Sequence, residues 1–114
     1  MHVPKDAVRL LDFEGLKISD YTERMGGSAS AAVIDVAPGV RHRTARSSIS
    51  DKFYFCLHGR VSFRVGERAI ILQAQDLLVV HRGEWFTYNN ETDQHVRLLL
   101  VHVPPFDLSA EEFQ

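Results

Sequence analysis

The sequence predicts an all-β domain, built as an antiparallel sandwich or barrel. Short apolar runs rich in Phe, Tyr, Val and Ile follow one another between residues 38 and 90, and each run ends at a turn that carries Gly, Asn or Asp. No long helical pattern and no internal repeat accompany them. A chain of 114 residues can build one hydrophobic core, so we expect one domain.

Residues 1–27 are expected to form an N-terminal arm with two edge strands. The run 8–13 ends at a Glu-Gly pair, and the run 16–21 has apolar side chains at positions 16 and 18. A Met-Gly-Gly-Ser stretch at 25–28 then interrupts regular structure. Arms of this kind often cross to a partner subunit because an open sheet edge invites pairing, so we expect a homodimer.

The barrel is assigned to residues 28–106, followed by a tail at 107–114 that either forms one helical turn or frays. The polar segment 41–50 is poor in β-branched residues and is expected to be a loop or an irregular edge. Each barrel strand is bounded by a turn signal, and two prolines stop the last one. The predicted strands are 31–36, 52–57, 61–65, 69–72, 76–80, 85–88 and 96–103.

Composition and charge exclude several classes of function. The net charge is −2 and the 13 Lys and Arg residues are scattered, which argues against nucleic acid as a partner. Apolar runs such as 77–80 are too short to cross a bilayer, and the N-terminus lacks the apolar stretch of a signal peptide. A single cysteine forms no internal disulfide, so we expect a cytoplasmic protein without a membrane partner.

The order of strands and turns resembles the small, single-domain bacterial cupins. Pro38-Gly39 stands where the first cupin motif opens, and 53–59 matches its aromatic strand and closing glycine. Residues 76–80 resemble the strand after the usual Gly-Asp turn, and Gly83 and Asn90 match the glycine and the final asparagine of the second motif. The resemblance covers residues 31–106 and implies a cupin-type double-stranded β-helix, or jelly-roll barrel.

The metal-ligand positions of the cupin motifs are degenerate in this chain. His42 lies near the first histidine of the family, but Thr44 replaces the second and Lys52 replaces the glutamate. Phe86 stands in place of the histidine of the second motif. A stable metal site needs three or four converging donors, and an ammonium group repels a cation. We therefore expect no metal and no cofactor.

Lysine at the glutamate position suggests a different kind of site. Residues two apart on a strand share a face, so Lys52, Tyr54 and Cys56 point the same way, which is into the barrel if the register of the family holds. His42 and Arg46 share a face of the neighbouring segment if that segment is extended. The sequence then predicts that Lys52 and Arg46 bind an organic carboxylate or phosphate.

Burial of a lysine is costly unless its charge is paired. An anionic ligand or an acidic neighbour is therefore expected beside Lys52. The alternative is that Lys52 extends to the mouth of the barrel, with Asp51 or Glu84 as its partner.

Three residues are candidates for catalysis. His42 or Tyr54 would act as acid or base, and Lys52 would hold the anion; the ordinary pKa of histidine lies close to working pH. Four further residues are candidates for ligand binding. Cys56 is more simply a small core residue, and Trp85 and Phe86 are more simply packing residues than an aromatic wall of the site. His102 points inward if its face of the last strand is the core.

Three functions stay open. The first is a small-molecule site without a tightly bound metal, with isomerase or lyase chemistry on an anionic or sugar-like substrate if the protein is an enzyme. The second is a non-catalytic dimeric module, a ligand sensor or a dimerisation domain; residues 82–90 resemble those of the metal-free cupin of the centromere protein family. The third is a metal-dependent cupin with non-standard donors, His42, His81 and His102.

Overall fold

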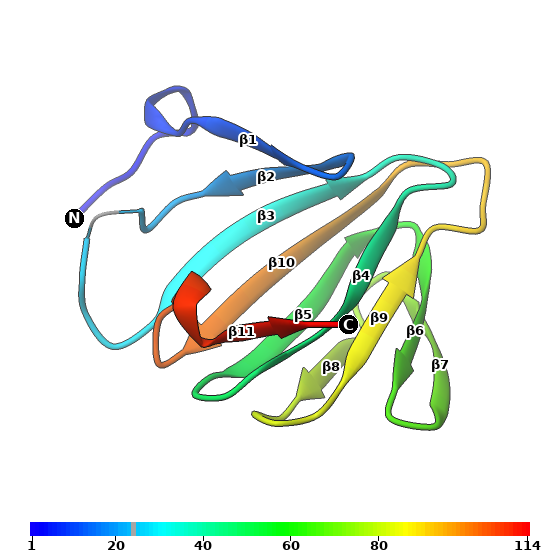
Figure 1. Cartoon of the computed structure of the whole chain (residues 1–114). Helices are drawn as coiled ribbons and strands as arrows, with labels where there is room; N and C mark the ends of the chain where they lie inside the picture. Colours follow the sequence, from blue (N-terminus) through cyan, green and yellow to red (C-terminus); the bar gives the residue numbers. More distant parts are fainter. Residues whose placement is uncertain (24) are drawn as a thin grey trace.

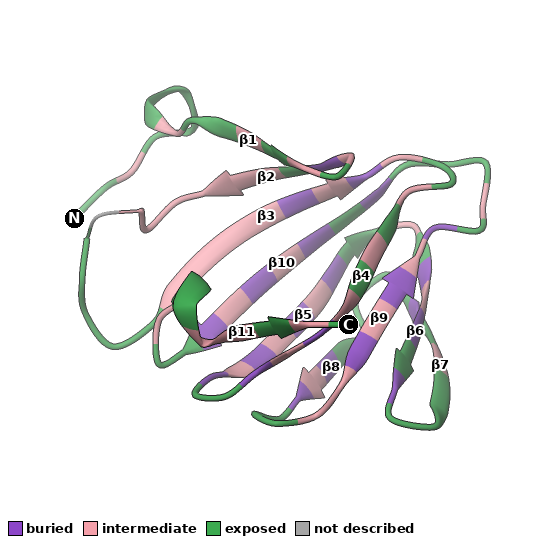
Figure 2. Cartoon of the chain, in the orientation of Figure 1, coloured by how far each residue is buried: buried purple, intermediate pink, exposed green. Residues whose placement is uncertain are grey.

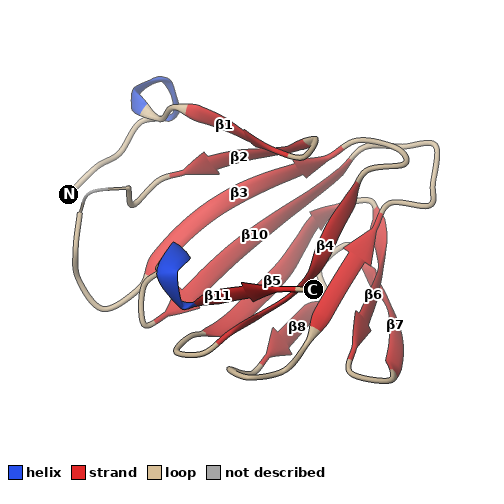
Figure 3. Ribbon diagram, in the orientation of Figure 1, coloured by secondary structure: helices blue, strands red, loops and turns tan. Residues whose placement is uncertain are grey.

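The computed structural model describes residues 1–23 and 25–114, and it consists almost entirely of antiparallel strands (Figures 1 and 3). One sheet has the strand order β1-β2-β3-β10-β5-β8, and the other has the order β11-β4-β9-β6-β7. The strands of the first sheet are β1 (Leu10–Phe13), β2 (Leu16–Asp20), β3 (Ser30–Val36), β10 (Val96–Val103), β5 (Asp51–His58) and β8 (Leu77–Val80). Those of the second are β11 (Glu111–Phe113), β4 (Arg41–Ser47), β9 (Phe86–Asn89), β6 (Arg60–Val65) and β7 (Arg68–Gln73).

The predicted all-β jelly roll is confirmed, and most strands lie within two residues of their expected bounds. The strand β10 has the bounds predicted for it, because its run of apolar residues is closed by two prolines that cannot extend a ladder. No helix in residues 1–23 and 25–114 is long or apolar enough to cross a bilayer; the helical segments there are two single turns, η1 (Lys5–Ala7) and η2 (Leu108–Ala110).

The N-terminal arm forms the hairpin β1–β2, which adds to the edge of the first sheet through β3 of its own chain. Ile18 lies opposite Ile34 in this pairing, and Leu16 is fully buried. The turn between the two strands is Glu14-Gly15, both at positive φ, a conformation that glycine adopts without strain. Exchange of this arm between subunits stays a prediction.

The expectation of a loop at 41–50 is wrong. Residues 41–47 form β4, which pairs with β9 on one side and β11 on the other. A β-bulge interrupts the β4–β9 register: His42 lies opposite Tyr88 and Ala45 opposite Phe86, so three steps on β4 match two on β9. Pairing on both sides supplies the hydrogen bonds that the polar local sequence alone did not predict.

The C-terminal tail is ordered by the second sheet rather than frayed. Asp107 precedes η2, and its side chain accepts from the Ser109 N–H. After η2, residues 111–113 form β11. This strand pairs with β4, with Glu112 opposite Arg46. The chain therefore ends beside the barrel wall, as Figure 1 shows, and its last strand contributes side chains to the interior.

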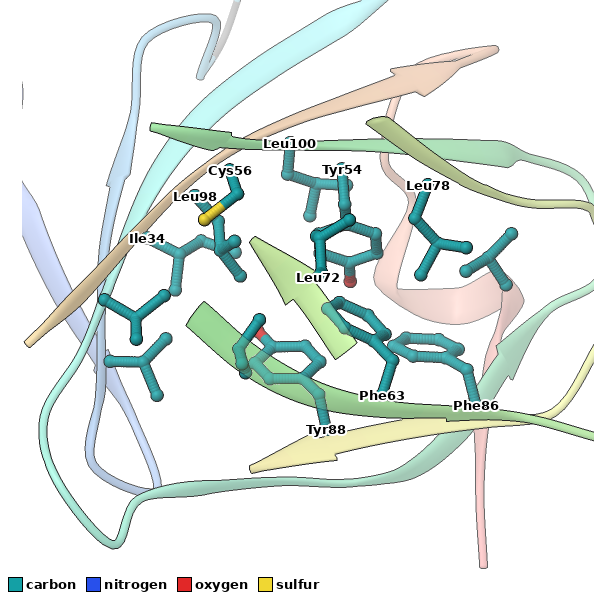
Figure 4. Close-up of a cluster of buried hydrophobic side chains, with 14 of the residues drawn as sticks. Ile34, Tyr54, Cys56, Phe63, Leu72, Leu78, Phe86, Tyr88, Leu98 and Leu100 are labelled. Carbon is teal, nitrogen blue, oxygen red and sulfur yellow. The ribbon is translucent and has the colours of Figure 1, made fainter. Parts of the chain in front are cut away.

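Burial alternates along the central strands, so every second side chain enters the space between the sheets (Figure 2). Lys52, Tyr54 and Cys56 all face inward on β5, as predicted. Four aromatic rings meet in the core (Figure 4), and the Tyr54 ring lies with its edge toward Phe63 at a centroid distance of 5.0 Å. The rings belong to Tyr54, Phe63, Phe86 and Tyr88.

Candidate functional site

A cavity of about 370 Å³ lies between the two sheets. The hairpin β1–β2 forms one wall, β3, β5 and β10 form its back, and the C-terminal segment after β10 covers another side. Most of the lining is apolar. Its histidine, lysine, tyrosine and glutamate side chains come from β4, β5, β9, β10 and β11, and two aspartates and a serine come from β1, β2 and β3. The side chains that line it and can bind or react are Asp12, Asp20, Ser30, His42, Lys52, Tyr54, Tyr88, His102 and Glu111.

Lys52 is the centre of the polar group. In the β5–β10 register it lies opposite His102, and its Nζ is 2.9 Å from His102 Nε2. The same Nζ donates to Glu111 Oε1 at 2.6 Å, across from the second sheet. Only 3% of the Lys52 side chain and 6% of the Glu111 side chain are exposed. The acidic neighbour required by a buried lysine is therefore supplied by the last strand of the chain.

The electrostatics of this pair set the state of His102. A lysine ammonium only donates hydrogen bonds, so His102 accepts through an unprotonated Nε2. Burial, together with the Lys52 charge, lowers the pKa of His102 from 6.5 to about 3. Burial also lowers the pKa of Lys52, while the Glu111 carboxylate acts against that shift. The cluster is an ammonium–carboxylate pair beside a neutral imidazole.

His42 faces the same cavity from β4 with one ring nitrogen free. Its Nδ1 is 2.5 Å from the Arg43 carbonyl oxygen, which only accepts, so the proton of the neutral ring resides on Nδ1. Nε2 then carries a lone pair. Burial, together with the positive charges of Lys52 and Arg43, lowers the pKa of His42 from 6.5 to about 4. At neutral pH, His42 is therefore an unprotonated base.

Two tyrosines complete the reactive side of the cavity. The Tyr88 ring lies 5.0 Å from the His42 ring and 5.7 Å from the Tyr54 ring, measured between centroids. Burial raises the pKa of both phenols, so both stay protonated and able to donate. Among the residues that the structure describes, the buried Tyr88 Oη has no hydrogen-bond partner. A buried hydroxyl without a protein partner is costly, so the Tyr88 hydroxyl is available for a hydrogen bond inside the cavity.

Of the residues predicted from the sequence, the structure brings His42, Lys52, Tyr54 and His102 together at the cavity. The others lie elsewhere, and each has another partner. Arg46 is turned outward because the bulge after His42 changes the phase of β4, and it donates to Glu112 at 2.9 Å. The prediction that Arg46 shares a face with His42 is wrong.

Three further candidates for ligand binding do not line the cavity. Cys56 is buried in the core, where its thiol contacts the carbonyl oxygens of His58 and Gly59, and burial raises its pKa. Trp85 packs under the Arg46 guanidinium, 4.5 Å from the ring centroid. Phe86 lies behind the cavity, 5.4 Å from Lys52 Nζ. Their roles as ligand contacts find no support in this placement.

Five polar residues of the cavity were not among the predicted ones: Asp12, Asp20, Ser30, Tyr88 and Glu111. Tyr88 lay in a predicted strand, and its inward phase was readable from alternation with Phe86. Glu111 comes after the two prolines that end β10, in a segment that was predicted to be a C-terminal tail. No local signal therefore assigned it to a strand. The alternative partners for Lys52 are also excluded: Asp51 accepts from the Arg82 N–H and Glu84 from the His81 N–H.

The profile of the cupin domain family matches residues 32–102, more than half of the chain. The chain belongs to the cupin family. No curated protein sequence matches this cupin. Comparison with solved structures finds many similar folds.

Three solved structures illustrate the likeness. A variant of Streptomyces PAC13 with uridine is 18% identical at a TM-score of 0.88 and aligns over 99% of this chain and 89% of its own; Pac13 is described as a nucleoside dehydratase. The Cnp3 cupin domain of Schizosaccharomyces pombe is 20% identical at 0.73, over 87% and 70%. A cupin-2 domain protein of Rhodospirillum rubrum is 16% identical at 0.83, over 100% and 80%. At these identities the likeness concerns the fold alone.

Many cupins hold a divalent metal, and the donor set of this cupin does not fit one. The ammonium of Lys52 stands at the position of a ligand and already uses the lone pair of His102. Across the described residues, no three His, Cys, Asp or Glu side chains converge in a way that could hold a metal ion. The alternative donor set also fails, because His81 is exposed at a turn beside Asp51 and lies outside the cavity.

Proposed function

We propose that this cupin binds a sugar-bearing, nucleoside-like molecule in the cavity and eliminates water from it by proton transfer, without a tightly bound metal. The observation that carries the proposal is the grouping of an unprotonated His42, the Lys52 ammonium and two tyrosine hydroxyls around one cavity. The likeness to a nucleoside dehydratase in its fold supports the choice of chemistry.

The size and lining of the cavity support a small, flat ligand. A volume of about 370 Å³ lies within the usual range for ligand sites, about 300–1,000 Å³. Aromatic and aliphatic walls suit a planar ring, and Phe13, Leu11 and Leu100 contribute to them. The Tyr88 hydroxyl, which has no partner among the described residues, is available to a ligand acceptor or donor.

The proposed reaction needs an acidic C–H bond, which places a carbonyl group next to it in the substrate. A base removes the proton from the carbon beside the carbonyl, and the electrons of the broken C–H bond form an enolate. The enolate collapses to a C=C double bond as the hydroxyl on the next carbon leaves, and an acid supplies the proton that makes it water. The substrate is thus a β-hydroxy carbonyl compound, and no redox partner is required.

The side chains divide these tasks between them. His42 Nε2 accepts the proton, since its ring is unprotonated at neutral pH and its Nδ1–H is held by the Arg43 carbonyl. The Lys52 ammonium stabilises the enolate oxygen with the one N–H that His102 and Glu111 leave free. Tyr54 and Tyr88, whose pKa values are raised by burial, donate hydrogen bonds to the leaving hydroxyl and keep their protons. Protonated His42 returns the proton that it took from carbon to this hydroxyl, which leaves as water.

Two measurements test the proposal. Calorimetry with uridine tests binding, and mass spectrometry with a β-hydroxy carbonyl nucleoside tests for loss of one water. We expect His42→Gln to lower kcat about 10²- to 10⁴-fold with little change in ligand affinity. The matched control is His58→Gln, at an exposed strand end. Absence of both binding and dehydration in the unmodified protein would refute the proposal, and stoichiometric metal by elemental analysis would refute its metal-free part.

We also retain the homodimer as a proposal. The outer face of the first sheet carries an apolar ladder, in which Phe53 lies opposite Val79 and Phe55 opposite Leu77. Leu77 is 58% exposed, and a contiguous apolar patch on the face of a sheet marks an interaction surface. Light scattering that gave the mass of one chain at micromolar concentration would refute the dimer. A non-catalytic dimeric module would instead be indicated by a dimer that binds no small molecule.

A further inference from the structure

The charges around the cavity are unlike those of an anion site. The lining contains one lysine against three carboxylates, Asp12, Asp20 and Glu111, and no arginine among the described residues. The two histidines are neutral at pH 7, because burial lowers the pKa of His42 to about 4 and that of His102 to about 3. An anion that entered the cavity would meet more negative than positive charge.

The one cation is already neutralised. Lys52 and Glu111 are both almost fully buried, and Nζ and Oε1 are 2.6 Å apart. Of the three N–H donors of the ammonium, one is directed at Glu111 and one at His102, so a single N–H remains for a ligand. The pair presents a hydrogen-bond donor without a net charge.

The nearby arginines are held outside the cavity. Arg43 lies over the Phe113 ring, 4.8 Å from its centroid, and pairs with Glu14 at 3.7 Å. Arg46 is fixed between Glu112 and the Trp85 ring. Neither lines the cavity, so neither balances the carboxylates from within it.

The two aspartates are placed as acceptors. Asp12 accepts from the Gly15 N–H and pairs with Lys17, which lowers its pKa. Asp20 accepts from the N–H and the hydroxyl of Thr22 through one oxygen, Oδ1. A carboxylate has about four lone-pair sites, so both can still accept from ligand hydroxyl groups.

We propose that Glu111 is a specificity-determining residue: by neutralising Lys52 it makes the cavity select an uncharged, hydroxyl-bearing ligand and reject the phosphorylated or carboxylate form of that ligand. This inference rests on the proposed function of the same cavity and names its substrate class. It replaces the anionic ligand expected from Lys52 and Arg46, since one of those cations is already paired and the other points outward.

The test compares uridine with uridine 5′-monophosphate by calorimetry on the full chain and on two variants. The unmodified protein should bind uridine at least about tenfold more tightly than the monophosphate, because a like charge in a desolvated site is strongly unfavourable. Glu111→Gln should reverse the preference by a similar factor, since it exposes the Lys52 charge. The matched control, Glu112→Gln, removes the neighbouring carboxylate outside the cavity and should behave like the unmodified protein.

Inorganic phosphate is the second probe and requires no nucleoside site. If Glu111→Gln alone gains phosphate binding, the inference is supported, even if uridine binds to no variant. The lack of uridine binding would then count against the proposed function only. Monophosphate bound as tightly as uridine by the unmodified protein overturns the inference and leaves the proposed function standing. No gain of anion binding in folded Glu111→Gln also overturns it.

A third variant covers the case in which Glu111→Gln does not fold. Lys52→Met/Glu111→Gln removes both charges together and should bind no phosphate while keeping the preference for uridine over the monophosphate. Phosphate binding by this double variant would overturn the inference, because the anion would then be held by something other than Lys52.

Discussion

Breaking the Lys52–Glu111 pair is expected to cost far more stability than replacing it as a unit. Both side chains are more than nine-tenths buried, and the charged atoms are 2.6 Å apart. Removal of one partner leaves an uncompensated buried charge, at a cost of about 3–5 kcal/mol. Because water in the cavity can solvate the remaining ammonium in part, we expect the low end, about 3 kcal/mol, for Glu111→Gln.

The double replacement Lys52→Met/Glu111→Leu removes both charges and their desolvation cost, so its free energy of unfolding should lie within about 1 kcal/mol of the original or above it. Urea denaturation with an unchanged m-value measures each variant. The control is the exposed pair of Arg46 with Glu112, where Glu112→Gln should cost less than about 1 kcal/mol. If Glu111→Gln proves as mild as Glu112→Gln, the reasoning that Lys52 is held in a buried ion pair is refuted.

Three further predictions concern acid stability, a turn and the position of Arg46. Since the unfolded chain binds protons below its ordinary histidine pKa of 6.5 and native His102 does so only near 3, stability should fall as pH drops through this window. In His102→Gln, the loss of unfolding free energy across this pH range should be smaller by on the order of 4 kcal/mol. The exposed control His95→Gln should lose as much as the unmodified protein. Gly59→Ala should cost about 1–3 kcal/mol of unfolding free energy, because φ is +83° and a Cβ would lie 2.9 Å from the His95 carbonyl oxygen. Gly66→Ala, at φ +58° with open space around it, should cost clearly less. Equal losses in the two variants would contradict the clash. Arg46→Ala should leave uridine affinity within about twofold, and a larger loss by calorimetry would place Arg46 at the ligand.

Strand periodicity was enough to group three residues of the candidate site. On β5 and β10 the alternation is regular and unbroken near the cavity, so counting in steps of two showed which side chains share a face with Lys52, Tyr54 and His102. The resemblance to the cupins suggested that the face of Lys52 and Tyr54 is the inner one. The chemistry required by a buried lysine also predicted an acidic neighbour or an anionic ligand, although not which of the two.

The same counting failed on β4, where a single bulge changed the phase. His42 and Ala45 both face inward although they are three residues apart, and Arg46 is turned out as a consequence. A bulge is stabilised by the partner strand and leaves little trace in a polar local sequence. The direction of a side chain beyond such a point depends on pairing that the segment itself does not encode.

Local pattern by itself determined the fold class, the core strands and the face of β5 that Lys52 shares with Tyr54, because hydrophobic periodicity and turn residues act over a few neighbours. Only the tertiary structure decided what that lysine does. Glu111 lies 59 residues away from Lys52 along the chain, and it reaches Nζ because β11 pairs with β4 on the opposite sheet. The charge of the cavity, and with it the kind of ligand, is set by that contact, since Coulomb interactions depend on distance in space rather than on separation in sequence.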